Sequence, residues 1–343
     1  MHRESNIELL RLVLMFFIVM HHGIVHGLGL DGLSSWGGEL LVTHQDMLIV
    51  SLVNSCLIFA VNAFVLITGY FSLNLKKEKV IKLLTPALIY TLLFATIPLL
   101  SNAEYVSAVK SLFFLSQGPY WFILDYLFLM VLTPVINDGY SKLNKHRSLV
   151  LIGLLLVINC YFGFLWGDKV NNNGYTLMQF VLMYIIGRHI RIHGFNLSKQ
   201  WVLSCFILTS IINGILFYIV HCLGYGGVAW KLTFYNNPLV IIGAISFFVL
   251  FLNIRIKSKV INYLSASALA IYLIQNTPLV SKWYYQTVAD YHMNNESIWL
   301  SLGIIAILSF VICCASICLD KICVPAFSKI YNCFNKHSEI LKF

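Results

Sequence analysis

The sequence predicts an all-α polytopic membrane protein that forms a single domain over residues 1–343. Hydrophobic residues make up 59% of the chain and charged residues 11%, whereas charged residues make up about 25% of an average soluble domain. Apolar runs of about twenty residues, the length that spans a bilayer as a helix, recur along the whole chain. Lipid offers no hydrogen-bond partners to the backbone, whereas a helix satisfies its backbone hydrogen bonds internally. No polar block is long enough to form a separate soluble domain.

Ten membrane spans are expected, and the charges of the loops between them give an orientation. Alternate loops carry eighteen of the 23 Lys and Arg residues, the remaining loops carry four, and Arg11 lies within a span. Because positive residues favour cytoplasmic loops, both termini are predicted to be cytoplasmic. The expected spans are 7–27, 47–71, 80–100, 119–137, 148–166, 175–193, 200–222, 236–253, 262–280 and 297–319.

The first span differs from the others in the ionisable residues that it carries, which are Glu8, Arg11, His21, His22 and His26. It lacks a small-residue cleavage site, so it is expected to be retained and not removed as a signal peptide. Ionisable groups inside a membrane are costly and usually functional. Arg11 and His22 are eleven residues apart, which places them within about 20° on one helical face and roughly 16 Å apart along the axis.

The histidines suggest proton-transfer chemistry. His22 can act as a general base at neutral pH in a polar cavity, and His21 is a second candidate. His22 and His26 share a helical face at i, i+4. The alternatives are a histidine bonded to a neighbouring helix and a metal pair. No other span supplies further metal ligands, so no metal is expected.

The charged residues near the cytoplasmic face each allow two interpretations. Arg11 either pairs with Glu8 at i, i+3 or anchors phosphate groups, for which its guanidinium is well suited. Lys79 and Lys82, at the start of the third span, either contact lipid headgroups or form a basic lip for a nucleotide-phosphate cofactor.

The fourth span carries Trp121 near its start and Asp125 one turn later, on the same helical face. The pair either forms a polar link between helices or has a role in the site. In the second case Asp125 orients a catalytic histidine or binds a sugar hydroxyl, while the Trp121 indole stacks on the sugar.

Charge, cysteine content and the lack of a repeat argue against nucleic-acid binding, a disulfide framework and transport. The net charge of +9 comes from residues spread over many loops, which does not indicate nucleic-acid binding. The nine cysteines lie mostly in apolar runs and are expected to be packing residues and not disulfide partners. No inverted repeat of interrupted helices is evident, which disfavours a transporter without excluding it.

Taken together, these motifs resemble the membrane-bound acyltransferase family 3. The spacing of Arg11 and His22 looks like the arginine-x10-histidine motif of that family's first span, and the start of the chain, Arg3 to Arg11, is also similar. Lys79 and Lys82 stand where members often have two arginines. Thr68 and Gln275 replace a common serine and histidine. The further similar segments are Phe64–Phe71, Tyr120–Phe122 and Tyr272–Ile274.

The resemblance implies transfer of an acetyl group from acetyl-CoA to a hydroxyl of a cell-surface or lipid-linked glycan, in the cytoplasmic membrane of a bacterium. Membrane lipid and the glycan are then the expected partners. The alternatives are a multi-span exporter with an intramembrane His/Arg proton relay and a scaffold subunit without chemistry. The implied site consists of catalytic His22, His21 and Asp125, cofactor-binding Arg11, Lys79 and Lys82, and substrate-binding Trp121 and His26.

Overall fold

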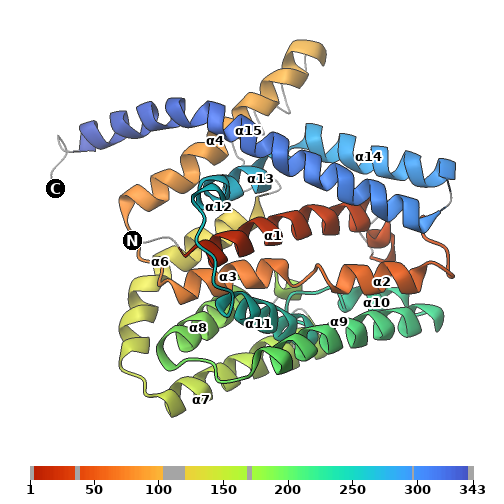
Figure 1. Cartoon of the computed structure of the whole chain (residues 1–343), viewed down its shortest axis with the longest axis horizontal. Helices are drawn as coiled ribbons and strands as arrows, with labels where there is room; N and C mark the ends of the chain where they lie inside the picture. The colour runs from red at the N-terminus through yellow and green to blue at the C-terminus, as the bar shows by residue number, and fades with distance from the viewer. Residues whose placement is uncertain (1–3, 35–38, 103–119, 168–171, 296, 339–343) are drawn as a thin grey trace.

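A computed structural model describes residues 4–34, 39–102, 120–167, 172–295 and 297–338 (Figure 1). The chain is 82% helix, and the described residues contain no strand. The all-α class is therefore confirmed.

Six helices in the described residues are long and apolar enough to cross a membrane. Each corresponds to one of the predicted spans, and the protein is a multi-pass membrane protein. The six segments are Ser5–Gly27, Met47–Tyr70, Trp121–Ser141, Lys145–Leu165, Lys199–Cys222 and Ile298–Ser328.

The four other predicted spans coincide with helices that do not meet the same criteria over the described residues. For this reason the ten-span count and the cytoplasmic termini stay predictions. These helices are α4 (Lys77–Asn102), α8 (Leu177–His193), α11 (Pro238–Leu252) and the series α12 (Lys259–Leu264), Ser265–Ser267 and α13 (Ala268–Gln275).

Two predicted spans are interrupted. The second consists of α2 (Met47–Ser55) and α3 (Ala60–Tyr70), with turns between them. In the ninth, predicted over 262–280, α13 ends at Gln275 and a separate helix, α14 (Pro278–Asn295), begins at Pro278. Pro278 explains this second break, because proline lacks an amide hydrogen and disfavours helical geometry in the residue before it.

The remaining elements of the fold are further helices and short helical turns. α1 (Ser5–His22) continues as a π-helical turn, Gly23–Gly27, and α7 continues as the π-helix Val157–Leu165. The 3-10 turns are Leu30–Leu33 and Asn172–Gly174. The other helices are α6 (Trp121–Ser141), α7 (Lys145–Leu156), α9 (Lys199–Cys222), α10 (Gly226–Lys231) and α15 (Ile298–Ser338).

α1 is the central helix of the bundle. It packs against α3, α11, α12, α13 and α15 (Figure 1), and 56% of its most apolar stretch is buried within the protein. By contrast, α7 with its π-helical extension is 17% buried over its own stretch. Most of its side chains therefore face lipid, whereas α1 is positioned to line an internal site.

Glycines allow α3 and α8 to approach closely. A Cβ atom added to Gly69 would lie 2.1 Å from the carbonyl oxygen of Tyr184, and one added to Gly187 would lie 2.3 Å from that of Leu66. Since small residues let membrane helices pack backbone to backbone, this crossing holds α3 tightly. Phe64 and Thr68, which line the site, lie on the same helix.

The α3–α4 and α6–α7 connections lie at the same end of the bundle as the first turn of α1, at the left in Figure 1. α10 lies at the opposite end. The first of these ends carries the lysines near residues 76–82 and 142–147, so we expect it to face the cytoplasm.

This orientation can be tested by cysteine labelling in a variant whose native cysteines are replaced. We expect a membrane-impermeant maleimide to label Tyr225→Cys in intact cells, and Lys142→Cys only after permeabilisation. Both residues have exposed side chains. The reverse pattern would show that the termini are outside, and labelling of both sites in intact cells would show that the two ends are not separated by the membrane.

Candidate active site

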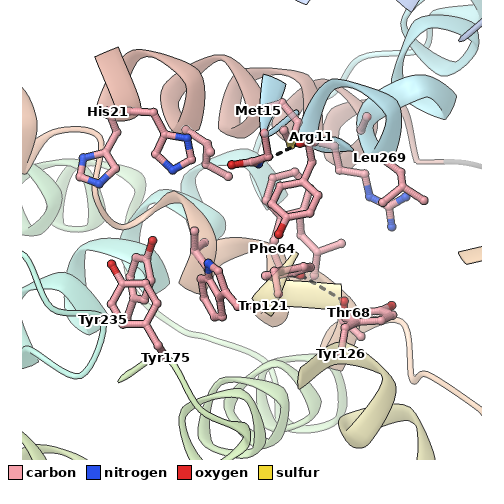
Figure 2. Close-up of a pocket in the computed structure, with 18 of the residues that line it drawn as sticks. Arg11, Met15, His21, Phe64, Thr68, Trp121, Tyr126, Tyr175, Tyr235 and Leu269 are labelled. Carbon is pink, nitrogen blue, oxygen red and sulfur yellow. Dashed lines mark hydrogen bonds between the residues drawn. The ribbon is translucent and has the colours of Figure 1, made fainter. Parts of the chain in front are cut away.

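A cavity of about 610 Å³ runs beside α1, and its lining extends from Glu8 to His26. Its other walls come from α3, α6, the segment from Ser265 through α13 and the loops before α8 and α11. Figure 2 shows His21, Tyr175 and Tyr235 toward one end, Arg11, Tyr126 and Thr68 toward the other, and Trp121 between them. The two ends are called the histidine end and the arginine end below.

His22 lies at the histidine end and is half-buried. Its Nδ1 is 3.1 Å from Oε1 and 3.0 Å from Nε2 of the Gln275 side chain. Among the described residues, no partner is recorded for the other ring nitrogen, Nε2. His22 is therefore anchored through Nδ1, and Nε2 is the nitrogen available for chemistry.

His21 has a different environment. Its Nδ1 is 2.6 Å from Oδ1 of Asn54, and the residue is only 7% exposed. Asn54 lies near the end of α2, next to the break before α3. The sequence left open whether a histidine here bonds to a neighbouring helix, and for His21 the structure shows that bond.

His26 lies in the π-helical turn, and its Nδ1 is 2.8 Å from Oδ2 of Asp31. Its ring centroid is 5.8 Å from that of His22 and 4.9 Å from that of Tyr285 on α14. With 40% of its side chain exposed, His26 is the most accessible of the three histidines. π-Helical turns occur frequently at functional sites.

Glycines position α14 against this turn. A Cβ atom on Gly23 would lie 2.1 Å from the hydroxyl oxygen of Tyr284, and one on Gly27 would lie 2.7 Å from Cγ1 of Val288. Because there is no space for larger residues, the glycine side of the turn packs on α14. The histidine side is left to line the cavity.

Arg11 defines the other end of the cavity. Its Nη1 is 3.8 Å from Oε1 of Glu8, which is longer than a hydrogen bond. Glu8 instead accepts a hydrogen bond of 2.6 Å from the Ser265 hydroxyl. The expected Glu8–Arg11 pair is thus present but loose, and the guanidinium keeps donors for an anionic ligand.

Lys79 and Lys82 do not line the cavity, and both are exposed near the start of α4. Leu83 does line it. Lys79 lies one helical turn before Leu83 at i, i+4, and Lys82 directly precedes it. Both lysines are therefore close in sequence to the arginine end, without belonging to the cavity itself.

Of the predicted pair Trp121 and Asp125, only Trp121 lines the cavity. The Trp121 ring lines the cavity, with centroids 4.7 Å from Tyr175 and 5.8 Å from Tyr235. Asp125 is half-buried, and it is not among the residues that line the cavity. The cavity side of α6 contains Phe122 and Tyr126 instead, so the structure does not bring Asp125 to the histidines.

The loop that carries Tyr235 is held by buried amides. The side-chain amides of Asn62 and Gln179 donate hydrogen bonds of 2.8 Å and 2.9 Å to the Tyr235 carbonyl oxygen. Burial raises the pKa of the Tyr235 hydroxyl well above its ordinary value, and the nearby Tyr175 raises it further. Tyr235 therefore stays protonated and can act as a hydrogen-bond donor.

The described residues contain no group of three or more His, Cys, Asp or Glu side chains that could hold a metal ion. At the histidine end, the oxygen partners of the three imidazoles are Asn54, Gln275 and Asp31.

Comparison with known proteins gives one family. An acyltransferase domain model matches residues 4–318. The chain belongs to the acyltransferase 3 family. No curated protein and no solved structure matches it. With its apolar helices, this acyltransferase 3 chain is a membrane acyltransferase.

For this acyltransferase 3 protein, sequence reasoning found most of the cavity's ionisable groups but missed several neutral ones. Gln275 had no predicted role, although its amide contacts His22. Tyr175 is the first residue of the sixth predicted span and Tyr235 directly precedes the eighth, so hydropathy gave neither tyrosine a role in a site. The presence of Asn54 and Asn62 in an apolar span was the signal available for the amide partners.

The His21–Asn54 contact gives a stability prediction. Asn54→Leu removes the partner of a buried imidazole, and an unsatisfied buried polar group costs about 1–3 kcal/mol. We expect the free energy of unfolding in detergent to fall by that amount. Asn294→Leu is the control, because Asn294 is exposed on α14. Equal stability of the two variants would contradict the assignment.

Proposed function

We propose that the protein transfers an acetyl group from acetyl-CoA to a hydroxyl of a cell-surface or lipid-linked glycan. One observation carries the proposal: a single cavity joins Arg11 at one end to His22 and His26 at the other. Such a cavity can hold an anionic donor and a neutral acceptor at opposite ends. Membership of the acyltransferase 3 family favours this reaction over the export of a glycan.

The arginine end suits the phosphates of coenzyme A. The Arg11 guanidinium is only loosely paired with Glu8, and arginine binds phosphate through two parallel hydrogen bonds. Lys79, one turn from the cavity-lining Leu83, adds positive charge nearby. Between the two ends, apolar side chains such as Met15 and Ile67 line the cavity. They would accommodate the uncharged arm that joins the phosphates to the thioester.

The histidine end suits a sugar. Trp121, Tyr175 and Tyr235 form an aromatic cluster in the wall of the cavity. Aromatic rings offer apolar faces to the C–H groups of a sugar, and tyrosine also has a hydroxyl for hydrogen bonding. His26, the most exposed of the three histidines, would contact the acceptor as it enters.

His22 is the proposed catalytic residue. Its Nε2 removes the proton from the acceptor hydroxyl as the hydroxyl oxygen attacks the carbonyl carbon of the thioester. The C–S bond then breaks, and the departing thiolate takes the proton from the imidazolium. Alternatively, Nε2 attacks the thioester carbonyl carbon first, and the C–S bond breaks to release the coenzyme A thiolate. The acceptor oxygen then takes the acetyl group from Nε2 as the thiolate takes the acceptor proton. Covalent labelling of His22 by labelled acetyl-CoA, without acceptor, would distinguish the second route.

The proposed orientation places acetyl-CoA at the cytoplasmic face of a bacterial membrane, where Arg11 and the basic loops lie, and the glycan at the opposite face. It follows from the positive-inside rule and from the position of the two cavity ends along α1.

Two substitutions test the division of roles in purified protein with labelled acetyl-CoA. His22→Ala removes the base and is expected to lower kcat by about 10²–10⁴-fold. Arg11→Lys keeps the charge but loses the paired hydrogen bonds, so KM for acetyl-CoA is expected to rise about tenfold, equivalent to ~1.4 kcal/mol.

The matched controls are His146→Ala and Arg147→Lys, because both residues are exposed and lie outside the cavity. An unchanged kcat in His22→Ala would overturn the catalytic role. An unchanged KM in Arg11→Lys would show that Arg11 only pairs with Glu8.

A further inference from the structure

Gln275 is a buried amide directed at the proposed catalytic histidine. It is the last residue of α13 and is 1% exposed. Both of its side-chain polar atoms lie within 3.1 Å of Nδ1 of His22. Among the described residues, no other hydrogen-bond partner is recorded for this amide. Buried polar groups in proteins are nearly always hydrogen-bonded. For the Gln275 amide, the partner is Nδ1 of His22.

We propose that Gln275 is a positioning residue that fixes the tautomer of His22. Its Oε1 accepts a hydrogen bond from Nδ1–H, and this leaves Nε2 unprotonated at the cavity. In a neutral imidazole one nitrogen carries the proton, and the hydrogen bond at one nitrogen determines the state of the other. The consequence for catalysis rests on the proposed function, in which Nε2 of His22 is the reacting atom.

The neighbouring histidines support this orientation of the amide. An amide can place either its oxygen or its nitrogen toward Nδ1, because the two atoms have nearly the same shape. At His26, however, the partner of Nδ1 is the Asp31 carboxylate, which when ionised only accepts. At His21 the partner is Oδ1 of Asn54. If the Gln275 oxygen faces Nδ1 of His22, all three histidine rings have an oxygen acceptor at Nδ1. In each ring, Nε2 then takes no part in this hydrogen bond.

The opposite orientation would disable the site. If the amide nitrogen donated to Nδ1, the ring proton would lie on Nε2, and this nitrogen could neither accept a proton nor attack a thioester. A neutral amide also holds the ring without adding a charge inside the membrane, where charged groups are costly. The break after α13, which Pro278 imposes, places Gln275 at the helix end facing α1.

Two nearly isosteric substitutions separate these possibilities. Gln275→Met keeps volume but removes the acceptor, so both tautomers become accessible. We expect kcat to fall about 10- to 100-fold, part of the roughly 10²–10⁴-fold that a positioned base contributes, while KM for acetyl-CoA is unchanged. Gln275→Glu keeps a carbonyl-type oxygen that can accept from Nδ1–H, so it is expected to retain more activity than Gln275→Met.

The controls are Gln286→Met and Gln286→Glu on α14, where the side chain is exposed and lies outside the cavity. Both are expected to behave as the parent protein. Parent-like kcat in Gln275→Met, or equal losses in Gln275→Met and Gln275→Glu, would overturn the proposal. Thermal unfolding of each variant in detergent shows whether a lower kcat comes from misfolding.

A spectroscopic measurement tests the tautomer without using activity. In protein labelled with ¹⁵N-histidine, the His22 signals are assigned by their absence from His22→Asn. We expect an unprotonated Nε2 in the parent and a mixture of tautomers in Gln275→Met. A protonated Nε2 in the parent would overturn the proposal. The expected spectra in a protein that transfers no acetyl group would overturn the proposed function and leave the positioning contact established.

Discussion

The structure depends on hydrogen bonds that hold three histidines of one central helix at their Nδ1 atoms. Imidazoles inside a membrane need polar partners, and each of the three has one from another element: Asn54 for His21, Gln275 for His22 and, beyond the π-helical turn, Asp31 for His26. Two of these partners lie next to helix interruptions, between α2 and α3 and after α13. Both amide partners therefore lie at or next to helix ends, and these helix breaks place them beside the histidines.

The position of α1 makes a cavity of this length possible. Helices pack around α1 on several sides, and the glycines of its π-helical turn fit closely against α14. The residues between the arginine end and the histidine end are mainly apolar, with hydroxyl groups such as those of Thr68 and Tyr126 near the arginine end. The middle of the cavity is therefore suited to an uncharged part of a ligand. The loosely paired Arg11 and Glu8 lie at the arginine end, near the basic connections.

The fold class and the importance of α1 could be predicted from sequence because they depend on local properties. Apolar runs identify helices, and Arg11, His22 and His26 stand out in an apolar segment. The helix breaks were harder to predict. Pro278 was visible in the sequence, but hydropathy alone joins residues 262–280 into one span. The turns between α2 and α3 have no proline or glycine signal.

Side-chain direction was the other limit of sequence reasoning. Asp125 and Trp121 are one turn apart, yet only Trp121 lines the cavity, because the part of α6 that faces the cavity is set by its packing against other helices such as α8. Gln275 and His22 are 253 residues apart, and no local pattern brings them together. Conversely, the eleven-residue spacing of Arg11 and His22 was informative because both residues belong to one helix, whose geometry fixes their separation.

The proposed function requires one cavity to connect a donor on the cytoplasmic side with an acceptor on the other side of the membrane. The most direct test uses proteoliposomes of known protein orientation, with labelled acetyl-CoA confined to one side and a glycan acceptor to the other. We expect acetylated glycan when acetyl-CoA is on the side of Arg11 and the acceptor on the side of His26, and none when the two are exchanged. Transfer only when both substrates are on the same side would contradict it.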